Sequence, residues 1–140
     1  MNFLLDTNAI SELVKPRPDA GLENWVSNAD EDSMYLSVVT IGELWRGIER
    51  LKAGTRKRRL ETWVTEQLFP RFEGRILDLT PTIAERWGRL MARSEGRGRR
   101  IGLIDAFLAA TAEAHGMTLV TRNVKDYKEA GTPVLCPWGK

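Results

Sequence analysis

The chain has 140 residues, of which 42% are hydrophobic and 29% charged, a composition typical of one globular domain with its own core. Its formal net charge of +2 indicates no particular partner, and its single cysteine excludes an internal disulfide and a cysteine-based metal cage. No apolar run approaches the roughly 20 residues of a membrane span, and the N-terminus lacks the pattern of a signal peptide. We therefore expect one cytoplasmic domain over residues 1–140, without membrane association.

Short apolar runs predict the strands of a parallel sheet that is buried on both faces. The segments between them repeat apolar residues at helical spacing, and strands that alternate with helices indicate an α/β domain with helices on both faces of the sheet. We therefore predict a three-layer α/β/α sandwich with a central parallel sheet of four to five short strands. In chain order, the expected strands are 3–5, 34–37, 75–79, 117–121 and 134–135, and the expected helices are 8–14, 22–29, 41–51, 60–68, 83–91 and 104–115.

Acidic and amide side chains fall at one predicted edge of this sheet. Asp6 ends the first strand, and Glu43 lies in the first turn of the helix after the second strand. Asp105 lies in the first turn of the helix before the fourth strand, and Asn123 and Asp126 follow that strand. Since the carboxyl ends of parallel strands and the N-termini of the following helices share one edge, we expect these side chains to gather there.

Each of these residues also has a purely structural interpretation. Asp6 is a possible helix N-cap, and Thr40 and Glu43 have the spacing of a capping box. The negative charge of Asp105 would interact favourably with the positive N-terminal end of its helix dipole. Asn123 is a possible N-cap of the next helix. Capping explains helix starts, but it does not explain carboxylates placed inside apolar segments, where they need a partner or a metal.

Several carboxylates in one pocket repel each other, and a divalent cation removes that conflict. Oxygen ligands favour Mg²⁺ or Mn²⁺, whereas zinc is disfavoured because His115 and Cys136 are the only residues of their kinds. A cation held in this way lowers the pKa of bound water and stabilises charge on a phosphoryl oxygen, which suits phosphodiester hydrolysis.

Four motifs in this order resemble the PIN domain, in particular the VapC/FitB-type toxins of bacterial toxin–antitoxin pairs. They are "LLDTN" at the N-terminus, "SVVTIGEL" around Glu43, "IDAFLAATA" around Asp105 and "LVTRNVKDY" near the C-terminus, and the likeness extends to the "PW" at Pro137 and Trp138. The resemblance covers nearly the whole chain, so it implies a single PIN domain over residues 1–140.

The resemblance implies an endoribonuclease that depends on Mg²⁺ or Mn²⁺, with Asp6, Glu43 and Asp105 as metal ligands and catalytic acids. Many relatives have a fourth acid where this chain has Asn123, so this position departs from their pattern and adds no charge. We expect the remaining polar residues of the site to orient the acids or to be auxiliary. These residues are Thr7, Asn8, Ser37, Thr40, Asn123 and Asp126.

The resemblance also implies partners: an RNA substrate, a cognate VapB-like antitoxin, and a second copy in a homodimer or a larger toxin–antitoxin assembly. Trp25, Trp45, Trp63 and Trp87 lie on apolar helix faces, which predicts core packing. The predicted helical hairpin with Trp45 and Trp63 is our first candidate for an antitoxin contact, since aromatic residues are enriched at interfaces.

Two basic clusters are candidates for RNA contact. The cluster over 56–59 fits a solvated helix face, whereas Arg97, Arg99 and Arg100 lie in a glycine-containing loop that leads into the helix of Asp105. Arginines at such a place suit RNA phosphates, so we expect these three to bind substrate.

Two other functions are compatible with parts of the pattern. One is a catalytically silent PIN-like module that binds RNA or protein, although the complete acidic set argues against it. The other is an aspartyl phosphatase or phosphotransfer domain, which the Thr7–Asn8 context of Asp6 disfavours because a D-x-D strand end is absent.

Overall fold

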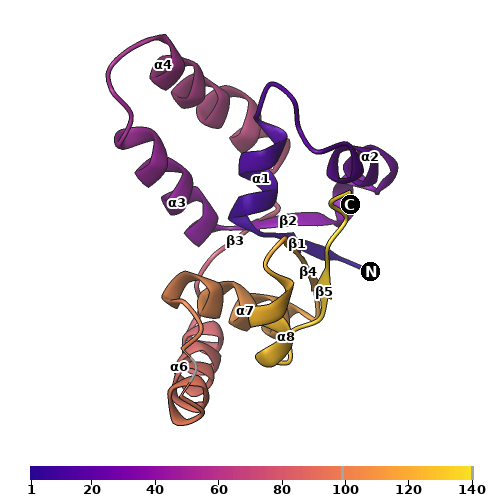
Figure 1. The fold of residues 1–140 in the computed structure, drawn as a ribbon, viewed down its shortest axis with the longest axis vertical. Helices are drawn as coiled ribbons and strands as arrows, with labels where there is room; N and C mark the ends of the chain where they lie inside the picture. Colours follow the sequence, from indigo (N-terminus) through magenta and orange to yellow (C-terminus); the bar gives the residue numbers. More distant parts are fainter. Residues whose placement is uncertain (99, 140) are drawn as a thin grey trace.

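A five-stranded sheet lies between two layers of helices in the computed structural model, which describes residues 1–98 and 100–139 (Figure 1). The strands run in the order β3-β2-β1-β4-β5, and every pairing is parallel. This confirms the predicted α/β sandwich with a parallel sheet. The strands are β1 (Phe3–Leu5), β2 (Met34–Ser37), β3 (Ile76–Leu77), β4 (Thr118–Val120) and β5 (Val134–Leu135).

The helices divide between the two faces of the sheet in the order of the chain (Figure 1). The first layer contains α1 (Thr7–Leu13), α2 (Ala20–Asn28), α3 (Val38–Glu49), α4 (Thr55–Thr62) and α5 (Phe69–Arg71), with the 3₁₀ turn η1 (Glu31–Ser33) and the π-helical turn η2 (Trp63–Leu68). The second layer contains α6 (Pro81–Gly96), α7 (Leu103–His115) and α8 (Val124–Glu129). In the described ranges, none of these helices has the length and apolarity that a membrane crossing requires.

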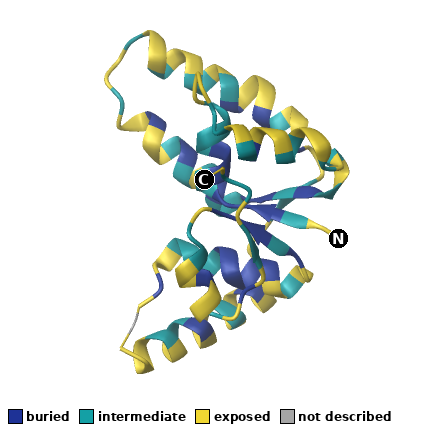
Figure 2. Ribbon diagram, turned by 45° about the vertical axis from the view of Figure 1, so that its right-hand side comes forward, coloured by how far each residue is buried: buried dark blue, intermediate teal, exposed yellow. Residues whose placement is uncertain are grey.

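Successive strand residues face opposite layers, and each layer has its own apolar core. Leu4 of β1 and Leu119 of β4 pack with α6, α7 and α8, whereas Leu5 and Val120 pack with α1, α2 and α3. These four side chains are at most 1% exposed. Because a strand has a period of two, β1 and β4 are buried on both faces, as Figure 2 shows for the centre of the molecule.

Helix α3 begins at Val38, earlier than the sequence predicted. The Ser37 hydroxyl accepts the Val39 N–H at 3.0 Å and caps this helix. Thr40 is therefore inside α3, and the proposed capping box of Thr40 and Glu43 is wrong.

The tryptophans are half-buried, and their packing follows the prediction only in part. Trp25 and Trp63 pack against the first core and Trp87 against the second, where it stacks on Phe107 with ring centroids 4.6 Å apart. Trp45 is in neither core of the described chain, so core packing is wrong for this residue.

The C-terminal segment is held against the first turn of α2. The Gly139 N–H donates to Asp19 Oδ2 at 2.9 Å, and Trp138 packs on the first core. The two segments approach so closely that a Cβ on Gly21 would lie 2.5 Å from the Pro137 carbonyl oxygen.

We expect Gly21→Ala to lower the free energy of unfolding by about 1–3 kcal/mol, because the added methyl group meets backbone atoms that must move. The matched control is Gly47→Ala in α3, where a Cβ has no neighbour within 4 Å. That variant gains helix propensity and should be more stable by about 0.5–1 kcal/mol. Urea unfolding of both variants tests this, and equal effects would contradict the close contact.

Candidate active site

The carboxyl ends of β1 and β4 lie side by side, at the place where the order of the strands reverses. Leu5 is paired with Val120, so Asp6 and Thr121 are the first residues beyond the paired positions. The Asp6 N–H donates to the Val120 carbonyl at 2.9 Å and continues the ladder by one bond. In open α/β sheets this reversal point is where ligands bind.

The Asp6 side chain is 4% exposed and accepts four hydrogen bonds. Its Oδ1 accepts the Thr7 N–H at 2.6 Å, which makes Asp6 the N-cap of α1 as the structural interpretation predicted. Its Oδ2 accepts from the Thr121 hydroxyl at 2.7 Å, from Asn8 Nδ2 at 3.3 Å and from the Tyr127 hydroxyl at 3.3 Å. The capping bond therefore uses Oδ1, while Oδ2 accepts the three side-chain hydrogen bonds of the site.

Asp105 is joined to Asp6 through a single hydroxyl. The Tyr127 OH lies 3.0 Å from Asp105 Oδ1 and 3.3 Å from Asp6 Oδ2, so its one proton is within reach of both carboxylates. Asn123 Nδ2 donates to Asp105 Oδ2 at 3.0 Å and to Asp126 Oδ2 at 3.2 Å. Asn123 occupies the N-cap position of α8 as interpreted from the sequence, but its side chain makes no capping hydrogen bond among the described residues.

Glu43 is half-buried in the second turn of α3, so its predicted place in the first turn is wrong. It is held by the N-terminal turn of α1. The Thr7 hydroxyl donates to Glu43 Oε1 at 2.5 Å and lies 3.2 Å from the Thr40 hydroxyl. Ser37 caps α3 and makes no hydrogen bond to Glu43 within the described chain. Thr7 therefore connects the acid of α3 with the end of β1.

Burial and neighbouring carboxylates disfavour the ionised forms of Asp6 and Asp105. The pKa of Asp6 is raised mainly by burial, partly offset by the Thr121 hydrogen bond, and the charges of Asp105 and Glu43 raise it further. Burial is also the largest cause of the raised pKa of Asp105, followed among the raising causes by the charge of Asp126. The pKa of Tyr127 is raised by burial and by the two carboxylates, so its hydroxyl stays protonated and donates.

The donor set suits a hard divalent cation, because the charges of Asp105 and Glu43 both act on the buried carboxylate of Asp6 at one edge of the sheet. Among residues 1–98 and 100–139, however, no three acidic, histidine or cysteine side chains are close enough to form a complete metal group. Hydrogen-bond donors occupy the space between the acids instead, with Tyr127 between Asp6 and Asp105. A cation that binds here would take over the lone pairs that these donors now engage.

Two residues of the site were missed by the sequence reasoning. Thr121 was predicted only as a strand residue, although it follows β4 as Asp6 follows β1, and the register makes them neighbours. Tyr127 is fully buried, and its place four residues after Asn123 on a helix is the signal that puts both on one face. Of the predicted basic residues, Arg97 and Arg100 are exposed near α8, and Arg99 lies outside the described residues.

Comparison with known proteins identifies the family. The model of the PIN domain matches residues 3–131. The chain is 34% identical to the VapC ribonuclease Y4jK of Sinorhizobium fredii over 97% of both proteins, and 33% identical to the toxin FitB of Neisseria gonorrhoeae over 97% of this chain and 98% of FitB. The chain therefore belongs to the PIN domain family, and its relatives include toxins and ribonucleases of the VapC and FitB type.

The fold is also that of solved structures of such proteins. The crystal structure of FitAcB from Neisseria gonorrhoeae superposes with a TM-score of 0.91 at 32% identity and covers 99% of both chains. VapBC2 from Rickettsia felis, bound to a DNA fragment from its promoter, gives a TM-score of 0.79 at 27% identity, with 99% of this chain covered and 100% of the other. The PIN-like sandwich expected from the sequence motifs is thus confirmed.

We expect Tyr127→Phe to destabilise the metal-free protein by about 1–3 kcal/mol, because two buried acceptors lose a common donor. For a chain of this size that is roughly 2–4 °C in Tm per kcal/mol. The control is Tyr35→Phe, because the Tyr35 hydroxyl has no hydrogen-bond partner among the described residues. Thermal unfolding in EDTA measures both, and an equal change in Tm would show that the bridging bonds contribute nothing.

The raised pKa of Asp105 predicts a pH-dependent penalty in the metal-free protein. Its folded pKa lies above the ordinary value of 3.8, so its contribution to stability falls as the pH rises from 3.8 through the raised pKa. The stability of Asp105→Asn relative to the unsubstituted protein should therefore increase over that window. Urea unfolding in EDTA between pH 3.5 and 8, roughly the range in which carboxyl groups titrate, measures the difference.

Glu31→Gln is the control with the opposite sign. The hydrogen bond from Arg71 lowers the pKa of Glu31 from 4.5, so its stabilisation is present above 4.5 and lost as the pH falls through the lowered value. This variant should be less stable than the unsubstituted protein above that pH and approach it below. A pH trend of the same sign in both variants would refute the assignment for Asp105.

Proposed function

We propose that this protein is a Mg²⁺- or Mn²⁺-dependent endoribonuclease and the toxin of a toxin–antitoxin pair. The observation that carries the proposal is the buried carboxylate of Asp6 at the reversal point of the sheet, on which the charges of Glu43 and Asp105 both act. The names of the relatives support it, since they include a VapC ribonuclease and the tRNA(fMet)-specific endonuclease VapC of Shigella flexneri, which is 30% identical over 94% of this chain.

In this proposal Asp6, Glu43 and Asp105 hold the cation, and Asn123 positions Asp105. When bound, the cation supplies a Lewis acid that lowers the pKa of water and stabilises negative charge on a phosphodiester oxygen. Glu43 Oε2 makes no hydrogen bond to a described residue, so it is the oxygen through which Glu43 would bind the cation or take a proton from water beside it. Thr7 holds Glu43 Oε1, and Thr121 holds Asp6, so both acids keep their direction during the reaction.

Regulation by a VapB-like antitoxin, in a homodimer or a larger assembly, is part of the same proposal. Solved structures similar to this chain support it, because they include FitAB bound to IR36 DNA and VapBC2 bound to promoter DNA. The α3–α4 hairpin is the candidate contact, since Trp45 on α3 lies outside both cores and the hairpin projects from the sheet in Figure 1.

Arg97 and Arg100 are proposed to bind RNA phosphates near the site. Both are exposed at the end of the loop between α6 and α7, and Arg97 also donates to the Glu129 carbonyl of α8 at 3.2 Å. Their guanidinium groups would counter the charge of the RNA backbone. Arg99 belongs to the same sequence cluster and to the same proposal.

We expect the purified protein to cleave structured RNAs in Mg²⁺ or Mn²⁺ and to lose this activity in EDTA. Asp6→Asn and Asp105→Asn should each lower the rate by more than about 100-fold, because each removes a charged ligand. Asp78→Asn, an exposed acid outside the site, is the control and should retain the rate. Tight RNA binding without metal-dependent cleavage would instead identify a silent PIN-like binding module.

A further inference from the structure

A cavity of about 690 Å³ lies between the C-terminal half of α6, the loop that follows it and α8. Ile101 bounds it on the loop side, where its N–H donates to the Ser94 hydroxyl at 2.7 Å and holds the loop against α6. Arg97 joins α6 to α8 through its bond to the Glu129 carbonyl. A hydrogen bond therefore fixes the cavity wall on each of these two sides. The volume is within the range of about 300–1,000 Å³ that is typical of small-molecule sites.

The cavity is lined by two chemically different surfaces. Leu90 and Ile101 are 6% and 7% exposed and, with Ala130, provide an apolar part. The polar part holds more cationic than anionic side chains: Arg93, Arg97, Arg100 and Lys125 against Asp126 and Glu129. An apolar surface beside an excess of positive charge suits a ligand with a flat apolar part and a negative part, which is the chemistry of a nucleotide.

The cavity is adjacent to the acidic site, and Asn123 connects the two. Asp126 lines the cavity and accepts from Asn123 Nδ2, and the same amide donates to Asp105. One amide side chain thus separates the wall of the cavity from an acid of the site. A polynucleotide whose phosphodiester lies at Asp105 would place an adjacent residue beside this wall.

We infer that this cavity is a nucleotide subsite, which takes the base and phosphate of the RNA residue next to the bond that is cut. This inference rests on the proposed nuclease function, because that function identifies the bound polymer as RNA. The base lies against Leu90, Ile101 and Ala130, and the phosphate lies among the guanidinium groups of α6 and Lys125 of α8. Such a site requires an unstacked base, so it selects single-stranded or looped RNA over a regular duplex.

The test is a titration of the metal-free protein in EDTA with the four nucleoside 5′-monophosphates and, separately, with inorganic phosphate, followed by amide chemical shifts. We expect saturable shifts at Ser94, Lys125 and Gly131, which line the cavity. No cleavage takes place under these conditions, so a failed nuclease assay and a failed subsite are separate results. Shifts confined to residues outside the cavity would refute the subsite.

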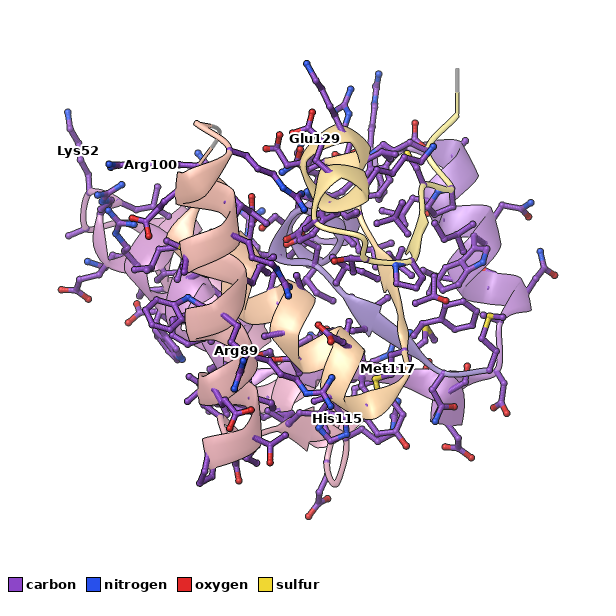
Figure 3. The ribbon with its side chains drawn as sticks, turned by 90° about the horizontal axis from the view of Figure 1, so that it is seen from below. Lys52, Arg89, Arg100, His115, Met117 and Glu129 are labelled. Atoms are coloured by element: carbon purple, nitrogen blue, oxygen red, sulfur yellow. The ribbon has the colours of Figure 1, made fainter. Side chains whose placement is uncertain are left out.

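Arg93→Ala and Lys125→Ala should each weaken nucleotide binding by at least about 5-fold, since each removes a charge that faces the phosphate. Arg89→Ala is the matched control, because Arg89 is one turn earlier on α6, is paired with Glu85 and does not line the cavity (Figure 3). Equal weakening by Arg89→Ala and Arg93→Ala would mean that only the general charge of α6 matters, and it would overturn the inference.

Ala130→Phe separates a nucleotide site from a phosphate site. The larger side chain fills the apolar part of the cavity, so it should weaken binding of the preferred nucleotide and leave binding of inorganic phosphate unchanged. Equal affinity of the unsubstituted protein for phosphate and for all four nucleotides would show that the base makes no contact, and it would reject the subsite. Thermal unfolding of Ala130→Phe verifies that this variant is folded.

Discussion

The arrangement of the whole site depends on one buried carboxylate, Asp6, and on the pairing of the two strands that place its partners. An ionised carboxylate at 4% exposure is stable only when its oxygens are engaged, and here four donors engage them. One donor comes from Thr121, which is next to Asp6 only because Leu5 is paired with Val120. A shift of this pairing by one residue would move every side chain of β1 to the other face and disconnect the carboxylate.

Charged side chains form two neighbouring zones around this carboxylate, one acidic and one mostly basic. The acids lie at the reversal point of the sheet, where their own repulsion makes a cation favourable. One group of basic residues, which lines the cavity, lies beyond Asn123 and Asp126 along α6, the loop after it and α8. A polyanion that approaches the second zone meets more cationic than anionic side chains there, and Asp126 and Asn123 lie between that zone and the acids.

The fold and the positions of the acids can be predicted from the sequence, because both depend on local patterns of residues. Apolar runs and helical periodicity predict the sheet and its layers, and Asp6 and Asp105 stand out as carboxylates in apolar segments. The start of α3 was misplaced because Ser37 and Thr40 are both good caps, and only the length of β2 decides between them. Trp45 was misassigned because a helical period alone does not indicate which elements pack on that face.

Tyr127 and Thr121 could not be assigned from pattern alone, since their role depends on which strands pair and on the direction of α8. The same holds for the cavity, which exists because α6 and α8, about one fifth of the chain apart in sequence, lie near each other in space. Long-range proximity of this kind is a property of the completed fold. It explains why the residues of the acidic site are predictable one by one, whereas the links between them are not.

The distance along the chain between Asp6 and Tyr127 has a consequence for biosynthesis. Asp6 leaves the ribosome 115 residues before its partner Thr121 and 121 residues before Tyr127. Nascent chains therefore cannot assemble the acidic site, whatever partial structure their helices adopt on the ribosome. The activity proposed for these acids therefore cannot arise in a nascent chain before Tyr127 has left the ribosome.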